Sequence, residues 1–378
     1  MPTSSSIALC RGSHMSVRDI FVKYGPAYLE AYRENMPANH KKVIQAIIDC
    51  RTENMGTIVG ACEKCGSVHE FYCSCGNRHC PTCQSDKAHQ WLEKQLGRLL
   101  PVNHFMITFT VPAAFRDLFR THQHFAYSAF FKATSQVMQK LGSENTYFKG
   151  NIPGFFGVLH TWGRTLSYHP HIHYIVPGGA FDASDYSWNS SHTKFFLPVR
   201  VMSKLVKSKM FQALKREDLL HLLNEKAWQK DWNVNSQPVG NGERSVRYLA
   251  AYVFRTAISD KRILAMEKGS ILFKYTDTRS GKNKIMKLQP FEFIRRFLQH
   301  VLPSGFMKIR YYGFLHPSSS IPLQAAVAIL EALYDVKAHP KMEKDTRSAL
   351  PRCEKCNARI LFRRFISADK GRIRSGYT

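Results

Sequence analysis

Three histidines in five residues, at positions 169, 171 and 173, constrain this chain more than any other feature. They stand in the segment His-Pro-His-Ile-His, which runs directly into Tyr-Ile-Val-Pro-Gly-Gly. Because side chains alternate between the two faces of a β-strand, His171 and His173 point to the same face and lie about 6–7 Å apart along it. Two imidazoles so placed can hold one divalent metal ion. The pattern therefore predicts a strand built around a metal site, although such histidines can also be ordinary polar-face residues.

A metal ion at this strand needs a third protein ligand. His160 lies in the preceding predicted strand, and a hairpin between the two strands would bring it beside His171 or His173. His169 and His104 are the competing candidates, and the proline after His169 disturbs the strand at that point. We therefore expect His160 to complete the site.

Two tyrosines four residues apart, Tyr248 and Tyr252, fall in a predicted helix over residues 244–256. An i,i+4 pair shares one face of a helix. Such a pair is more often packing than chemistry, but arginines that can bind phosphates in bidentate fashion lie on the same helix. These arginines are Arg244, Arg247 and Arg255. Together with the histidine strand, the tyrosines suggest metal-assisted attack of a tyrosine hydroxyl on a phosphodiester.

Two Cys-x-x-Cys pairs, Cys62 with Cys65 and Cys80 with Cys83, lie fourteen residues apart. Each pair can supply two thiolates at about 2.3 Å to a tetrahedral zinc ion. Cysteines so spaced favour metal binding in a reducing compartment over disulfides. The spacing predicts one structural zinc site with these four ligands.

Further cysteines and a histidine lie near these pairs. Cys50, Cys75 and His79, with an unidentified fourth ligand, predict a second zinc site, unless they are buried small residues or turn residues. A third pair, Cys353 and Cys356, lies in the basic C-terminal tail. A histidine elsewhere, a second chain or nothing could complete that half-site.

The chain carries 54 lysines and arginines against 28 acidic residues, which gives a formal charge of +26. This excess is spread along all 378 residues and favours a polyanionic partner such as DNA. Beside the cysteine pairs, the predicted DNA contacts are Lys64, Arg78 and Lys87. On the tyrosine helix, they are Arg244, Arg247 and Arg255. No segment approaches the roughly 18–20 apolar residues of a membrane span, so no membrane partner is expected.

Seven short motifs, taken in order, resemble rolling-circle transposases of the insertion-sequence 91 family, which are two-tyrosine members of the HUH endonucleases with an N-terminal zinc-binding domain. The motifs are Cys50-Arg-Thr52, Ser74-Cys-Gly-Asn-Arg-His-Cys-Pro81, Leu159-His-Thr-Trp-Gly163, His169-Pro-His-Ile-His173, Val246-Arg-Tyr-Leu-Ala-Ala-Tyr252, Glu292-Phe-Ile-Arg-Arg-Phe297 and Arg310-Tyr-Tyr-Gly-Phe314. The likeness covers residues 40–315, and its specificity comes from the order and spacing of the motifs.

The resemblance implies an α+β fold, with a central antiparallel sheet flanked by helices and a small N-terminal helical zinc-binding domain. It places His171 and His173 on the middle strand of the sheet. It also implies that Tyr248 or Tyr252 cleaves single-stranded DNA and leaves a 5′-phosphotyrosine, with Mg²⁺ or Mn²⁺ at the histidines and structural Zn²⁺ at the cysteines. Neutral histidines favour Mn²⁺. Tyr248 opens the motif and is expected to attack first.

The implied partners are single-stranded DNA at transposon ends and target DNA, in the bacterial cytoplasm and associated with the nucleoid. A plasmid replication initiator or relaxase would use the same chemistry, and a zinc-dependent DNA-binding protein without catalysis would share the charge and the cysteines. The zinc domain and the basic C-terminal region favour the transposase, and the histidines and tyrosines argue against the non-catalytic alternative.

Composition and pattern, together with the domains that the resemblance implies, divide the chain into five segments. They are a tag or disordered N-terminus (1–15), a helical zinc-binding DNA-contacting domain (16–100), a nuclease domain with an insertion near 181–240 (101–265), a hairpin-helix-strand extension of the core (266–336) and a basic tail with Cys-x-x-Cys (337–378). Alternating apolar residues over 104–111 predict a half-buried strand. A short strand is expected at 195–201 and a loop at 231–243.

Overall fold

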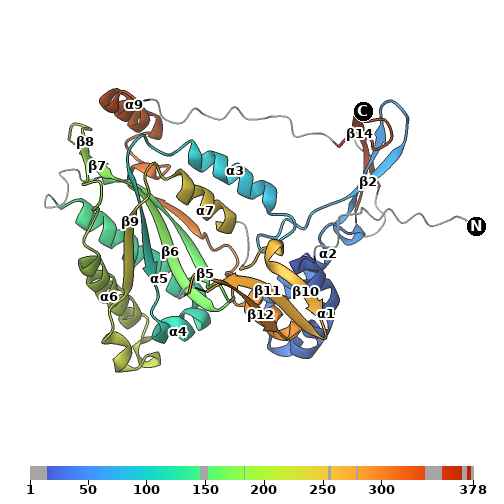
Figure 1. Cartoon of the computed structure of the whole chain (residues 1–378), viewed down its shortest axis with the longest axis horizontal. Coiled ribbons are helices and arrows are strands. Elements are labelled where there is room, and N and C mark those ends of the chain that lie inside the picture. Colours follow the sequence, from blue (N-terminus) through green and yellow to red (C-terminus); the bar gives the residue numbers. More distant parts are fainter. Residues whose placement is uncertain are drawn as a thin grey trace, which may run out of the picture.

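A five-stranded antiparallel sheet forms the centre of the computed structural model (Figure 1). The model describes residues 15–144, 152–182, 184–253, 257–277, 280–336, 351–367 and 373–375, so the predicted tag falls almost wholly outside it. The strands, in spatial order, are β13 (Ile309–Tyr312), β5 (Phe155–Trp162), β6 (Tyr168–Pro177), β3 (His104–Thr110) and β9 (Asn233–Pro238). The predicted α+β fold with a central antiparallel sheet is confirmed, and β6 is its middle strand.

Alternation along each strand separates two apolar layers. On β3, Phe105, Ile107 and Phe109 are buried in one layer, whereas Thr108 and Thr110 face the other side. The first layer is covered by α4 (Arg116–Thr121), α5 (Gln123–Gly142) and α6 (Val199–Arg216). The second is covered by α3 (Ser85–Leu96), α7 (Glu243–Val253) and α9 (Leu323–Tyr334). The sheet is therefore the middle layer between two sets of helices (Figure 1).

A second hydrophobic cluster joins the N-terminal helices to a segment from late in the chain. Its helices are α1 (Val17–Tyr32), α2 (Ala38–Asp49) and α8 (Pro290–Leu298), and its sheet consists of β10 (Ile263–Glu267), β11 (Ser270–Thr276) and β12 (Asn283–Leu288). Phe21 of α1 packs edge-to-face on Phe297 of α8, with ring centroids 5.0 Å apart. The first two helices thus share a core with residues some 240 positions later in the sequence.

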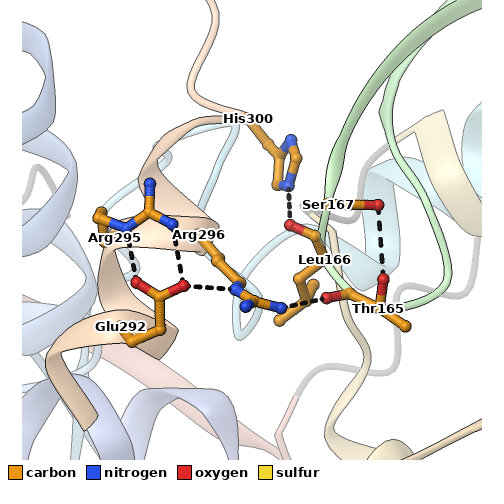
Figure 2. Close-up of polar contacts among 7 residues, drawn as sticks. All are labelled: Thr165, Leu166, Ser167, Glu292, Arg295, Arg296 and His300. Carbon is orange, nitrogen blue, oxygen red and sulfur yellow. Dashed lines mark hydrogen bonds and ion pairs between the residues drawn. The ribbon is translucent and has the colours of Figure 1, made fainter. Parts of the chain in front are cut away.

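Polar contacts fasten α8 to the turn between β5 and β6, as Figure 2 shows. Glu292 accepts hydrogen bonds from Arg295 and Arg296, and these lower the pKa of its carboxyl to about 2. Arg296 also donates to the carbonyl oxygen of Thr165 at 3.1 Å. His300 donates to the carbonyl of Leu166, a residue in the left-handed region at φ 60°. The left-handed conformation of Leu166 is strained, and the hydrogen bonds to the carbonyl oxygens of Thr165 and Leu166 hold it in place.

A small four-stranded sheet contains segments from both ends of the sequence. Its order is β15 (Ile373–Ser375), β14 (Ile360–Ile366), β1 (Thr57–Cys62) and β2 (Val68–Tyr72). Figure 1 shows this small sheet, with the labels β14 and β2, away from the central sheet. The chain also has a three-stranded sheet of β4 (Ile152–Pro153), β7 (Gly179–Phe181) and β8 (Trp188–Ser190).

Two expectations about local structure are wrong. The strand expected at 195–201 is absent, and α6 begins at Val199, because Pro198 occupies its N-cap position. The loop expected at 231–243 contains β9, an edge strand whose polar sequence hid it. The segment 181–240, where an insertion is predicted, contains α6, whose buried residues pack in the first apolar layer of the sheet. No helix in the described residues is both long and apolar enough to span a membrane.

The pairing of β5 with β6 depends on a glycine. Gly157 lies opposite Tyr174, and a Cβ atom at Gly157 would approach the Tyr174 ring to 2.4 Å. That ring is fully buried, and its hydroxyl is hydrogen-bonded to Thr134 at 2.7 Å, so it cannot move aside easily.

We expect Gly157→Ala to destabilise the fold by roughly 1–3 kcal/mol, because overpacking forces the backbone or the ring to shift. Thermal unfolding followed by circular dichroism would measure this. Gly97→Ala is the matched control, because a Cβ there meets nothing closer than 3.6 Å. Equal melting temperatures for the two variants would contradict the prediction.

Candidate functional site

Three histidines meet on the α7 side of the central sheet. His160 lies directly opposite His171 in the register of β5 and β6, and His173 lies two residues further along β6. Ligand atoms of all three residues lie within 4.8 Å of one another. The structure thus brings together the three histidines that the sequence analysis selected as metal ligands.

Hydrogen bonds to the other ring nitrogens leave Nε2 of two histidines available as ligands. His171 donates through Nδ1 to the carbonyl oxygen of His169 at 2.7 Å, which assigns its tautomer. The Nδ1 atom of His173 is hydrogen-bonded to Thr108 Oγ1 at 2.8 Å. The buried Nε2 of His173 has no hydrogen-bond partner among the described residues. This donor set fits a divalent cation, because metal-bound histidines usually engage their second nitrogen in this way.

Burial keeps the three imidazoles neutral. Desolvation lowers the pKa of His171 to about 4 and that of His173 to about 3. It also lowers the pKa of His160 well below its ordinary value, and the neighbouring charges of His173 and His171 add to the effect. A neutral imidazole has the free lone pair that a metal needs.

The two competing histidines are engaged elsewhere. Nδ1 of His169 accepts a hydrogen bond from the Arg116 guanidinium at 2.8 Å. His104 begins β3 and lies opposite Pro177, at the far end of β6 from His171. His160 is therefore the histidine that the fold places with the pair.

Helix α7 packs across the sheet beside these histidines. Val246, Leu249 and Val253 bury its apolar face, whereas Tyr248 is 45% exposed. The Tyr248 ring lies 6.2 Å from the ring of His173, almost perpendicular to it. The predicted nucleophile therefore borders both the three histidines and solvent. The backbone of Tyr252 lies one turn later in α7, but its side chain is outside the described residues.

The predicted DNA contacts divide into two groups. Lys64, Lys87, Arg244 and Arg247 are exposed, and Arg247 forms an ion pair with Glu243 at 2.8 Å. Arg255 lies outside the described residues. Arg78 is partly buried, and its guanidinium donates to the carbonyl oxygens of Pro303 and Phe306, so it fastens the zinc-binding segment to the core.

The predicted single site of Cys62, Cys65, Cys80 and Cys83 is wrong in its grouping. Cys80 and Cys83 lie with Cys50 and Cys75 in one cluster. Cys62 and Cys65 lie in another cluster, with Cys353 and Cys356. Spacing identified the pairs correctly, but it could not decide which pairs meet, because that depends on how β1, α2 and the tail pack.

The first cluster, made of Cys50, Cys75, Cys80 and Cys83, has the geometry of a zinc site. Its Cys75 and Cys83 sulfurs are 3.6 Å apart. Four sulfurs around zinc at about 2.3 Å in a tetrahedron are separated by about 3.8 Å. A hydrogen bond from Cys75 lowers the pKa of the Cys80 thiol to about 5, which favours the thiolate. Two of the residues predicted for a second zinc site, Cys50 and Cys75, therefore belong to the cluster that contains Cys80.

His79, the third residue of that prediction, is not in either cluster. It is buried, and its Nε2 accepts a hydrogen bond from the Leu302 backbone at 3.3 Å. Burial lowers its pKa well below the ordinary value. Its side chain thus joins the zinc-binding segment to the core. Cys80 and Cys83 take the two positions beside Cys50 and Cys75 that were predicted for His79 and a fourth ligand.

Two residues near the histidines escaped the sequence analysis. Thr108 forms a hydrogen bond to His173 and so orients its ring. The sequence could have indicated this role, because Thr108 lies on the polar face of β3, the strand that pairs with the histidine strand. Lys308 precedes β13, and burial lowers the pKa of its amine to about 7. Nothing in its local sequence marks that burial.

Comparison with known proteins gives two family matches. Residues 154–321 match the family described as "Putative transposase", and residues 20–111 match the "Transposase zinc-binding domain". The first range contains the three histidines and α7, and the second contains the whole first cysteine cluster.

Two relatives align over most of the chain. "Putative transposase y4qJ" of Sinorhizobium fredii is 38% identical over 319 residues, which cover 79% of this chain and 80% of the relative. The transposase for insertion sequence element IS801 of Pseudomonas savastanoi pv. phaseolicola is 28% identical over 354 residues, which cover 86% and 84%. No solved structure matches this chain.

We expect Thr108→Val to weaken Mn²⁺ binding at the histidines by about 10–100-fold, because His173 loses the hydrogen bond that orients its ring. Titration of Mn²⁺ followed by electron paramagnetic resonance would measure this. Thr110→Val is the matched control, because Thr110 faces His171 on the same side but forms no hydrogen bond to a histidine in the described part of the chain. Equal Mn²⁺ affinities in the two variants would contradict the role given to Thr108.

Proposed function

We propose that this chain, which belongs to the insertion-sequence 91 family of transposases, cleaves and rejoins single-stranded DNA through a 5′-phosphotyrosine intermediate in rolling-circle transposition. The observation that carries this proposal is the meeting of His160, His171 and His173 beneath Tyr248. A half-exposed hydroxyl next to a buried set of metal ligands suits attack on a phosphate that approaches from solvent.

The histidines would hold a divalent cation, Mn²⁺ or Mg²⁺. When bound, such an ion polarises the scissile phosphate and fixes its position. The protein supplies neutral ligands whose orientation Thr108 and the His169 carbonyl determine. Three imidazoles without a carboxylate favour Mn²⁺ over Mg²⁺, because Mg²⁺ prefers oxygen ligands.

Tyr248 is the proposed nucleophile. Its phenolic oxygen attacks phosphorus and forms the new P–O bond, while the bond from phosphorus to the 3′ oxygen breaks. The phenol gives up its proton, and the departing 3′ oxygen takes one up, so the DNA ends in a free 3′-OH and a 5′-phosphotyrosine. Attack by a 3′-OH reverses the step without ATP, because the phosphotyrosine keeps the energy of the original ester.

Tyr252 would provide a second attack. It lies four residues after Tyr248 in α7, so the two residues share one face of the helix. Two tyrosines permit two successive cleavages, one at the donor and one during strand transfer. Exposed Arg244 and Arg247 on the same helix would hold the DNA backbone.

The test is the formation of a covalent adduct on a denaturing gel, with labelled single-stranded DNA that carries the ends of the element. We expect an adduct with Mn²⁺ or Mg²⁺ and none with EDTA. Tyr248→Phe should reduce it on the order of 10³-fold or more, because the attacking oxygen is lost. Tyr186→Phe is the matched control, because Tyr186 is equally exposed, at 46%, and lies in the turn before β8.

Two further results would bear on the proposal. An adduct that persists in the double variant Tyr248→Phe/Tyr252→Phe would exclude both tyrosines and overturn it. Adduct formation by His171→Ala/His173→Ala at the wild-type rate would exclude metal assistance at this site. If these histidine variants bind DNA as the wild type does but form no adduct, the histidines are needed for cleavage and not for DNA binding. That result would favour the nuclease over a non-catalytic DNA-binding protein.

A further inference from the structure

The cluster of Cys62, Cys65, Cys353 and Cys356 brings together two pairs that are far apart in the sequence. The Cys62 and Cys356 sulfurs are 3.4 Å apart. The Cys65 sulfur is 3.6 Å from both Cys353 and Cys356. These separations are close to those of sulfurs around one tetrahedral zinc, and they are far longer than the roughly 2.05 Å of a disulfide.

The two pairs have the same sequence and the same backbone hydrogen bonds. Both read Cys-Glu-Lys-Cys, at residues 62–65 and 353–356. In the first, Gly66 N–H donates to the Cys62 carbonyl, and in the second Asn357 N–H donates to the Cys353 carbonyl.

The residue after each pair adopts the left-handed conformation, with φ 68° at Gly66 and 56° at Asn357. The N–H of the first cysteine then closes each loop, by donating to Ser67 in one case and to Ala358 in the other. Two loops that match in this detail, and that face each other, form the two halves of one binding site.

Strand pairing aligns these halves. In the register of β1 and β14, Cys62 lies opposite Ile360, so the two loops lie at the same end of the ribbon that β14, β1 and β2 form. Gly60 permits this close approach, because a Cβ there would lie 2.5 Å from the Ile360 side chain. Beyond Cys62, Cys353 and Ile360, few residues support the ribbon: the partly buried Phe71, Cys356 and Ala358. So small an apolar core needs another source of stability, which a metal ion provides in small domains.

We propose that these four cysteines bind one structural Zn²⁺ ion that joins the two ends of the chain. Four sulfur ligands in a compact arrangement favour zinc. Binding would release the thiol protons, because the ligands are thiolates. The chain would then hold two zinc ions, one at each four-cysteine cluster.

The ligands of this site come from opposite ends of the chain. Cys65 and Cys353 are 288 positions apart, and the whole central sheet lies between them in the sequence. The matched zinc-binding family region ends at residue 111, so half of the ligands lie outside it. The second zinc can therefore bind only after almost the whole chain has been synthesised. A protein that lacks the C-terminal segment with Cys353 and Cys356 cannot form this site.

Native mass spectrometry of the full chain tests the proposal. We expect two zinc ions in the wild type and one in Cys353→Ser/Cys356→Ser. Cys50→Ser/Cys75→Ser should also retain one, and the combined variant should retain none. Cys73→Ser is the matched control and should keep two, because Cys73 is the described cysteine that belongs to neither cluster.

A second measurement leaves all cysteines in place. A protease site inserted between residues 336 and 351 would, once cut, leave the second cysteine pair on a separate fragment. We expect the C-terminal fragment to co-elute with the remainder on size exclusion while zinc is bound, and to separate once phenanthroline removes the metal.

Three outcomes would overturn the proposal. One is a single zinc in the wild type together with a loss of free thiols at these four positions, which would indicate disulfides. Another is a variant without Cys353 and Cys356 that still holds two zinc ions. The last is a cut fragment that separates while both zinc ions remain bound.

Discussion

The register between β5 and β6 is the constraint on which the rest of the site depends. Because side chains on adjacent strands share a face when they lie opposite each other, pairing His160 with His171 places His173 on the same face. A slip of one residue would move every histidine of β6 to the opposite apolar layer. The turn held by α8, the ring of Tyr174 against Gly157 and the pairing with β3 all oppose that slip.

Burial at this register gives the histidines their chemical state. The apolar residues that stabilise the sheet also remove water from the imidazoles, and this lowers their pKa values and keeps the lone pairs free. Helix α7 buries one face against the same layer and leaves Tyr248 half-exposed above His173. The packing that holds the fold together therefore also arranges the proposed metal ligands and the proposed nucleophile.

The small sheet of β1, β2 and β14 is held in a different way. Around β1 and β2 the chain has few buried apolar residues, so hydrophobic burial contributes little there. Anchors such as Arg78 and His79 fasten the first cluster to the core, while the ribbon with the second cluster lies apart from the central sheet (Figure 1). The matched zinc-binding region contains the whole first cluster, whereas the second cluster takes two of its four cysteines from outside that region.

The sequence by itself determined the local patterns: the strand that carries His171 and His173, the helix that carries Tyr248, the cysteine pairs and the class of fold. Alternation and spacing act over a few residues, so they can be read directly from the sequence. Even His160 could be inferred, because a hairpin pairs strands that are neighbours in sequence. Only the tertiary structure decided which cysteine pairs meet, that Arg78 binds carbonyl oxygens of the core, and that polar β9 joins the sheet. These contacts join residues far apart in sequence, and their partners depend on the packing of the whole chain.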